Sequence, residues 1–193
     1  GPESAITRRH IIKLNRDIAA GLVSIVGGKL TTYRNLAQQT VDKVGKLLRR
    51  KLPACRTDDT DLPGAWGLDA AREKLEALEL LSGAGIDRLL HVYGGRAAAI
   101  AEICVNEPEL ASVLDDDRSV VAAEVAFAMR EEFAQTLDDI VFRRMMIGLD
   151  ADQGRPLYEA IAALAAAESG WSPQQLEEQR DALRQFAASW RVE

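Results

Sequence analysis

Residues 22–34 read Leu22-Val23-Ser24-Ile25-Val26-Gly27-Gly28-Lys29-Leu30-Thr31-Thr32-Tyr33-Arg34. This stretch begins as an apolar run, passes through a Gly-Gly turn that carries a lysine, and opens a helix at a threonine pair. Such a junction presents free backbone N–H groups and the positive end of a helix dipole. The pattern predicts a ligand-binding turn. The alternative is a plain connection whose glycines serve backbone geometry alone.

The segments around this turn predict a hairpin followed by a helix. Ile11–Leu14 and Leu22–Val26 are typical of two short strands, and the residues between them, 15–21, form the hairpin loop. A helix is expected from Thr32 to Arg50, with apolar residues on one face and basic residues near its end. Residues 53–67 are polar and rich in turn formers, which predicts a linker.

From Asp69 onward the pattern indicates helices only. Ser119–Gln135 is apolar around most of its circumference and is expected to be the central, most buried helix. Ser172-Pro173-Gln174-Gln175 has an N-cap serine, a proline at the first helical position and a glutamine at the third, which predicts a helix start. Gly83-Ala84-Gly85 lies between two helical segments and is expected to stop a helix. The predicted fold is mainly α, a helical bundle preceded by the hairpin and helix.

Composition indicates a compact module without a membrane span or a metal site. The chain has 193 residues, of which 47% are hydrophobic, enough to bury a core. No apolar run approaches the roughly 20 residues that cross a bilayer, and no signal peptide is present. Cys55 and Cys104 lack the spacing of zinc ligands, so no metal is predicted. Two free thiols fit a reducing cytoplasm; a single disulfide is the alternative.

The charge is distributed unevenly along the chain. Residues 1–56 hold 12 Lys/Arg and 3 Asp/Glu, whereas residues 57–193 hold 12 Lys/Arg and 27 Asp/Glu. A basic segment suits a phosphate, an anionic membrane or an acidic neighbour. Nucleic acid is disfavoured because no aromatic residues interleave the basic ones and no known binding module is present. The carboxylates and arginines between Arg130 and Arg144 are interpreted as solvated helical ion pairs.

Two motifs together resemble a known family. Gly-Gly-Lys-Leu-Thr-Thr-Tyr-Arg at 27–34, with Ile6-Thr7-Arg8 upstream, resembles the end of the flavin domain in FAD-dependent glycerol-3-phosphate dehydrogenases and the related α-glycerophosphate oxidases. Residues 4–56 carry the strong part of this resemblance, and the remainder is more loosely similar to the family's helical C-terminal domain. Neither an initiator methionine nor a strand followed by Gly-x-Gly-x-x-Gly is present, so a C-terminal fragment of a longer enzyme is expected.

The resemblance implies a domain plan and a set of site residues. Residues 1–52 would be the last piece of the FAD and substrate domain, an α/β flavin-binding domain, 53–67 the linker, and 68–193 the all-helical C-terminal domain. Lys29 and Arg8 would bind the substrate phosphate. The guanidinium group of Arg8 suits this role because it can donate to two phosphate oxygens at once. Main-chain contacts to the flavin ring of the cofactor would come from Gly27, Gly28, Leu30 and Thr31, and the Lys29 side chain would lie beside both the substrate phosphate and the flavin. No catalytic residue is assigned, because the general base is expected on the missing part.

The activity that the resemblance implies is oxidation of glycerol 3-phosphate to dihydroxyacetone phosphate by hydride transfer to FAD. Electrons would pass to quinone or to oxygen, in a cytoplasmic protein with peripheral contact to the cytoplasmic membrane. The fragment itself, without the missing N-terminal FAD domain, is expected to be inactive and to retain no FAD. The alternative from another class is an autonomous helical protein-interaction domain without catalysis.

Overall fold

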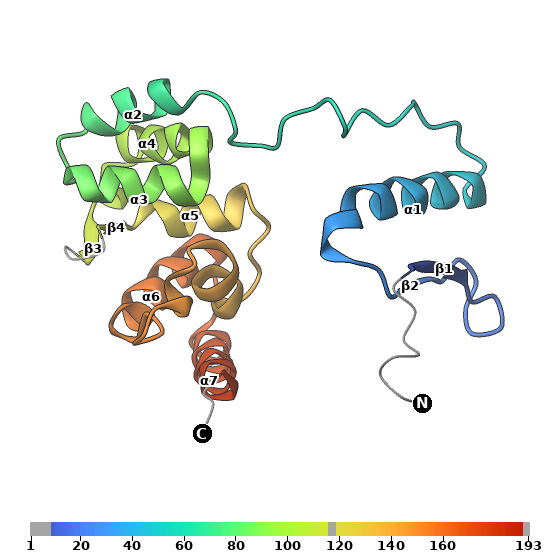
Figure 1. Cartoon of the computed structure of the whole chain (residues 1–193). Helices are drawn as coiled ribbons and strands as arrows, with labels where there is room; N and C mark the ends of the chain where they lie inside the picture. The colour runs from blue at the N-terminus through green and yellow to red at the C-terminus, as the bar shows by residue number, and fades with distance from the viewer. Residues whose placement is uncertain (1–8, 116–118, 191–193) are drawn as a thin grey trace. The chain divides into compact units, whose positions relative to one another are not determined.

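The computed structural model describes residues 9–115 and 119–190. The chain divides into two units, residues 1–61 and residues 62–193, and each is described by itself (Figure 1). The first unit holds the basic segment, and the second holds the helical bundle. The division falls inside the segment predicted as a linker.

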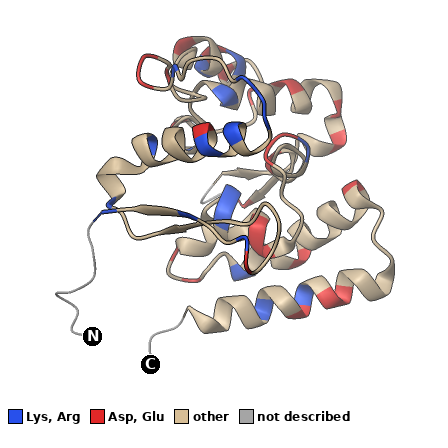
Figure 2. Ribbon diagram, turned by 90° about the vertical axis from the view of Figure 1, so that its right-hand side faces the viewer, with Lys and Arg blue, Asp and Glu red and all other residues tan. Residues whose placement is uncertain are grey.

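The first unit is the predicted hairpin followed by the predicted helix. Strands β1 (Ile11–Leu14) and β2 (Val23–Val26) pair antiparallel. The hairpin loop is closed by Asn15, whose side-chain amide donates to the Ser24 hydroxyl at 2.7 Å. A 3-10 turn at Leu30–Thr32 leads into α1 (Tyr33–Leu47), whose second half carries most of its charged residues (Figure 2).

Helix α1 ends three residues before the predicted boundary at Arg50. Arg49 adopts a left-handed conformation, with φ 53°, and the Arg50 N–H donates to the Gly45 carbonyl at 2.9 Å. The chain folds back so tightly that a Cβ on Gly45 would lie 2.5 Å from Leu52 Cδ1. The glycine therefore lets Leu52 cover the helix, and this contact ends it.

The first unit has almost no buried core of its own. Among its described residues, 9–61, only Asn15 and Gly45 are buried. The strand residues Ile11, Ile25 and Val26 are 51%, 48% and 55% exposed. A two-stranded hairpin is marginal in water without a packed face. These apolar strands thus lack, within their unit, the partner surface that their composition demands.

The second unit is a helical bundle with two buried clusters that meet at one helix. Its α-helices are α2 (Leu68–Glu76), α3 (Gly83–Tyr93), α4 (Ala97–Asn106), α5 (Ala123–Arg130), α6 (Tyr158–Ser169) and α7 (Pro173–Ser189), with a π-helix at Asp139–Arg144. Phe127 of α5 packs in the cluster with α2, α3 and α4. Val125 of α5 packs in the cluster with the π-helix, α6 and α7. Helix α5 is therefore central, as predicted.

The central helix is shorter than predicted at both ends: α5 ends at Arg130 rather than Gln135, and the start of the apolar run is a strand. β3 (Val113–Asp115) and β4 (Val120–Val121) pair antiparallel, so the expectation of helices alone after Asp69 was wrong here. Ser119 takes a left-handed φ of 52°, and the Ala122 N–H donates to the Ser112 carbonyl at 2.9 Å. These two features turn the chain before α5 can begin.

The glycine pair predicted to stop a helix begins one instead. Gly83 is the first residue of α3, and the Ser82 hydroxyl accepts the Gly85 N–H at 3.2 Å as an N-cap. A Cβ on Gly85 would lie 2.3 Å from Ser119 Cβ. The glycine is present because the helix packs closely on the turn before β4.

The helix start predicted at Ser172 is confirmed. The Ser172 hydroxyl accepts the Gln175 N–H at 3.3 Å, and the Gln175 side chain accepts the Ser172 N–H at 2.9 Å. This reciprocal pair satisfies two N–H groups that the first turn of α7 leaves without helical partners.

Residues 63–67, which we call the strap, pack on the turn between α3 and α4. The Gly95 N–H donates to the Gly64 carbonyl at 2.8 Å. A Cβ on Gly95 would lie 1.9 Å from the Trp66 carbonyl oxygen, although the Trp66 side chain is 70% exposed. The end of the predicted linker is thus part of the helical unit.

We propose that the helical unit folds alone and that the strap stabilises it. The fragment 62–193 should unfold cooperatively. Fragment 68–193 should melt about 3–6 °C lower, since it loses a backbone hydrogen bond worth roughly 0.5–1.5 kcal/mol and the strap's packing. Thermal unfolding followed by circular dichroism compares the two. A non-cooperative transition in fragment 62–193 would show that its core needs the first unit.

Gly95→Ala should lower the free energy of unfolding by about 1–3 kcal/mol, the scale for overpacking. The added methyl group cannot fit beside the Trp66 carbonyl, so the strap must move. The matched control is Gly83→Ala, because a Cβ there meets nothing within 4 Å. In the first turn of α3, alanine should be neutral or stabilising. Urea denaturation measures both, and equal effects at the two glycines would argue against the strap contact.

Candidate functional site

The turn between β2 and α1 needs its two glycines for backbone conformation. Gly27 has φ 74° and Gly28 has φ 110°, values that L side chains rarely adopt. A Cβ on Gly28 would be in ordinary contact with His10 Cβ at 3.5 Å and Leu36 Cδ2 at 3.7 Å. The constraint is therefore conformational rather than spatial, and it leaves the outer surface of the turn without side chains.

Lys29 follows the glycines in extended conformation, and hydrogen bonds to its carbonyl oxygen fix its main chain. The Thr32 hydroxyl donates to the Lys29 carbonyl at 3.0 Å, and the Thr32 N–H donates to the same oxygen at 3.0 Å. The residue is exposed. Its main chain is fixed while its ammonium group is accessible to a ligand.

The residues after Lys29 form a helix start that suits an anion or a polar ring edge. Leu30 and Thr31 begin the 3-10 turn that leads directly into α1. The first N–H groups of a helix have no partner within it and lie at the positive end of its dipole. Leu30 is 89% exposed, so these groups are near an open surface.

His10 belongs to the neighbourhood of this turn, which the sequence did not indicate. Its ring Nε2 lies 3.0 Å from Gln39 Oε1 on α1. Lys43, one helical turn further, donates from Nζ to the Ile12 carbonyl at 2.5 Å. These two contacts fasten α1 to the hairpin. No local signal in the sequence pointed to this contact, because His10 precedes β1 and Gln39 lies on α1.

The structure thus brings five of the predicted site residues into one turn: Gly27, Gly28, Lys29, Leu30 and Thr31. Arg8 lies outside the described residues, 9–115 and 119–190. Its position near Lys29 stays a prediction.

The described residues outside this turn show neither a cluster of metal ligands nor a membrane-spanning helix. Within residues 9–115 and 119–190, no three His, Cys, Asp or Glu side chains gather as metal ligands. No helix in those ranges combines the length and apolar character that crossing a bilayer requires. The two cysteines are unbridged, and burial raises the pKa of the Cys104 thiol to about 11.

Comparison with known proteins identifies the family. The family model for the C-terminal domain of alpha-glycerophosphate oxidase matches residues 55–176. Glycerol-3-phosphate dehydrogenase of Synechocystis is 36% identical over 182 residues, which are 91% of this chain and 32% of the relative. Glycerol-3-phosphate dehydrogenase 2 of Mycobacterium tuberculosis is 30% identical over 88% of this chain and 29% of its own length. A probable mitochondrial glycerol-3-phosphate dehydrogenase of Caenorhabditis elegans is 30% identical over 94% of this chain and 26% of its own length.

The chain spans about a third or less of the length of these relatives. The family match covers well over half of it, from the segment before the strap into the first turn of α7. The chain therefore belongs to the family defined by the C-terminal domain of alpha-glycerophosphate oxidase, whose members include proteins named glycerol-3-phosphate dehydrogenase.

Proposed function

We propose that this chain is the C-terminal part of an FAD-dependent enzyme that oxidises glycerol 3-phosphate to dihydroxyacetone phosphate. The observation that carries the proposal is the turn at residues 27–32, where an exposed lysine follows two left-handed glycines at a helix start. The names of the relatives supply the substrate class.

The exposed strands support a role within a larger domain. Ile11, Ile25 and Val26 are each about half exposed, and residues 9–61 bury no apolar side chain fully. Such a hairpin gains stability by joining a larger sheet or core. We propose that the flavin-binding domain of the longer protein supplies it, and that residues 1–52 complete that domain.

The residues of the turn fit a flat, polar cofactor. FAD, when bound, supplies the acceptor for the hydride that leaves C2 of glycerol 3-phosphate. Gly27 and Gly28 would let the ring approach the main chain, and the N–H groups of Leu30 and Thr31 would donate to its polar edge. The dipole of α1 would favour negative charge at that edge.

The basic side chains of Lys29 and Arg8 would bind the phosphate group of the substrate. The Lys29 ammonium group, on an exposed residue, would donate to phosphate oxygens. Arg8 would add a guanidinium fork to the same phosphate. Both residues orient the substrate, and the general base would come from another part of the longer protein. The acceptor of the electrons would be quinone, with peripheral contact of this cytoplasmic protein to the membrane, or oxygen.

The test compares the longer protein that contains this chain with the chain alone. The longer protein should carry one FAD and oxidise glycerol 3-phosphate with an artificial dye as acceptor. Chain 1–193 should be colourless and inactive. Activity with a quinone analogue but not with oxygen would assign the acceptor. A longer protein without flavin and without activity would favour the helical interaction domain instead.

A further inference from the structure

A pocket in the helical unit is lined by three arginines from two separate segments. Its volume is about 650 Å³, within the range of small-molecule sites. Arg96 comes from the turn between α3 and α4, and Arg143 and Arg144 end the π-helix. His91, Glu131, Glu132 and Met146 are also in the lining.

Arg144 is positioned by uncharged acceptors. Its Nε donates to the Glu132 carbonyl at 2.8 Å, and its Nη1 lies 3.4 Å from the Arg143 carbonyl. Of the carboxylates in the described ranges, none forms an ion pair with Arg144. Backbone carbonyls fix the guanidinium without neutralising it, which leaves its charge and its remaining N–H groups for a ligand.

The other two arginines are fixed and partly neutralised. Arg96 donates to Glu132 Oε1 at 3.0 Å and lies 4.8 Å from the centroid of the Phe127 ring. Arg143 pairs with Asp138 and with Asp139, the latter at 2.7 Å. Arg96 uses one N–H group in these contacts and keeps others free to donate. Arg144 therefore provides a positive charge that no ion pair neutralises, and the exposed Glu131 adds a negative charge to the same lining.

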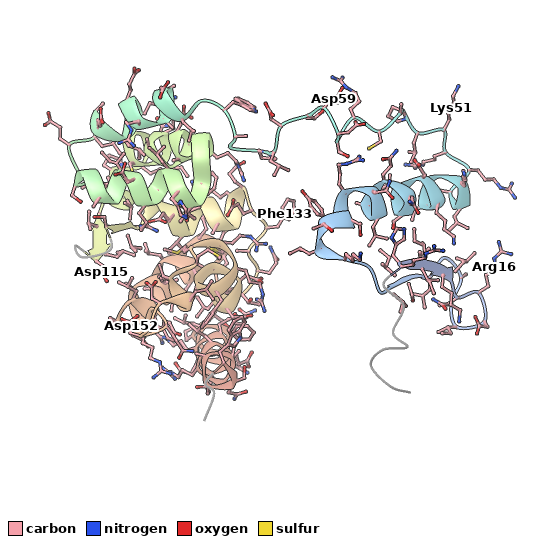
Figure 3. The ribbon with its side chains drawn as sticks, in the orientation of Figure 1. Arg16, Lys51, Asp59, Asp115, Phe133 and Asp152 are labelled. Atoms are coloured by element: carbon pink, nitrogen blue, oxygen red, sulfur yellow. The ribbon has the colours of Figure 1, made fainter. Side chains whose placement is uncertain are left out.

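The backbone around the pocket is unusual in three places. A π-helix of six residues delivers Arg143 and Arg144, and π-helical segments are frequent at functional sites. Met146, in the lining, and Phe133, close by in sequence to Glu131, are left-handed with φ 63° and 56°. Phe133 is 81% exposed at the edge of its unit (Figure 3). Such conformations cost free energy and persist where the surroundings enforce them.

We propose that this pocket binds the oxyanion group, phosphate or carboxylate, of a small ligand, with Arg144 as the principal contact and Arg96 beside it. The site lies in the helical unit and does not depend on the function proposed for the turn at 27–32.

Chain 1–193, labelled with ¹⁵N, would be titrated with inorganic phosphate against sodium chloride of equal ionic strength. The signals followed are the Arg144 Nε–H and the amides of residues 130–146. We expect saturable shifts with a Kd on the order of 1–10 mM, as for one charged group. A parallel titration with citrate, a carboxylate, distinguishes the two oxyanion groups. Binding of phosphate alone indicates a phosphate site, binding of citrate alone a carboxylate site, and binding of both a site that accepts either group.

Three variants make the test decisive. Arg144→Gln should weaken binding about tenfold or more, because a charge-assisted contact is lost. Glu131→Gln should tighten it about two- to fivefold, because an opposing charge is removed. Arg155→Gln is the control, since Arg155 bonds to Gln153 outside the lining.

The tighter phosphate binding expected in Glu131→Gln cannot come from misfolding. It therefore tests the proposal even if Arg144→Gln fails to fold. Shifts that chloride reproduces, or an unchanged Kd in both pocket variants, would overturn the proposal. Equal weakening in Arg155→Gln would also overturn it, as a general effect of charge.

Discussion

Glu124→Ala is expected to lower the free energy of unfolding of the helical unit by about 3–5 kcal/mol, the scale for removing one partner of a buried ion pair. Domains of this size are stable by only about 5–15 kcal/mol, so the variant should be close to unfolding. Glu124 is on α5, between the two buried clusters, and its side chain is completely inaccessible to solvent.

The reason is that three donors depend on this one carboxylate. Arg88 of α3 forms an ion pair with Oε1, the Val121 N–H donates to Oε1 at 2.9 Å, and the Tyr93 hydroxyl donates to Oε2 at 2.8 Å. Burial, with the charge of Glu124 second, raises the pKa of Tyr93 well above its usual value, so the hydroxyl keeps the proton it donates. Alanine would leave the Val121 N–H and the Tyr93 hydroxyl buried without this acceptor, and Arg88 would keep only the Ser119 carbonyl, at 3.3 Å.

Chemical denaturation of chain 1–193 measures the effect, with two comparison variants. Glu124→Gln keeps the shape and loses the charge, and should cost about 1–3 kcal/mol. Glu102→Ala breaks the ion pair with Lys74, whose side chains are 59% and 48% exposed, and should cost less than about 1 kcal/mol. If Glu124→Ala cost no more than Glu102→Ala, the network would contribute nothing beyond a surface ion pair.

The parts of the fold that sequence predicts are those determined by neighbouring residues. The capping box at Ser172 uses side chains three positions apart, and both halves of it form. The hairpin at 11–26 is indicated by two short apolar runs separated by a polar loop, and both strands lie within a residue of their predicted bounds. Local patterns suffice where the partner is within a few positions.

The errors arise where a distant segment decides. The run Ser119–Gln135 is apolar around most of its circumference, so no stripe on one face marks where its helix begins. Its first residues form a strand with Val113–Asp115 rather than a turn of helix. The segment from Gly83 begins α3, and Gly85 in its first turn packs on Ser119, a contact that the local sequence does not show. Tertiary packing overrides intrinsic propensity at both places.

The ion pairs also show that local sequence does not reveal partners from distant segments. Arg143 pairs with Asp139 at helical spacing, as predicted. Arg130 instead bridges Glu107 and Glu168, residues from two other segments, and Arg144 bonds to backbone carbonyls. The spacing of charges predicts neighbours on one helix but not partners across a bundle. The pocket around Arg144 was missed for this reason.

The candidate site at the turn was predictable because it is a continuous segment. Gly27 to Thr31 needed only the strand before them and the helix after them. The contact of His10 with Gln39 joins residues 29 positions apart and was not predicted.

The last prediction tests the substrate roles of Lys29 and Arg8 in the longer enzyme. Lys29→Ala and Arg8→Ala should each reduce kcat/KM for glycerol 3-phosphate by about 2–4 kcal/mol in transition-state free energy, the scale for losing a charge-assisted contact in a desolvated site. Flavin content should stay near normal, because neither side chain is proposed to bind the diphosphate of FAD. Lys46→Ala is the matched control, since Lys46 is an exposed lysine of the last turn of α1.

The decisive quantity is the ratio of kcat/KM for glycerol 3-phosphate to that for glycerol. Glycerol lacks the phosphate, so its oxidation should lose far less from either substitution, and the ratio should fall in both variants but not in Lys46→Ala. Lys29→Arg should recover part of the ratio, because the charge returns on a different geometry. A ratio that stays at the wild-type value in Lys29→Ala would mean that the lysine is a solvated turn residue. A ratio that falls together with flavin content would mean that Lys29 acts mainly through its contact with the flavin rather than through the phosphate.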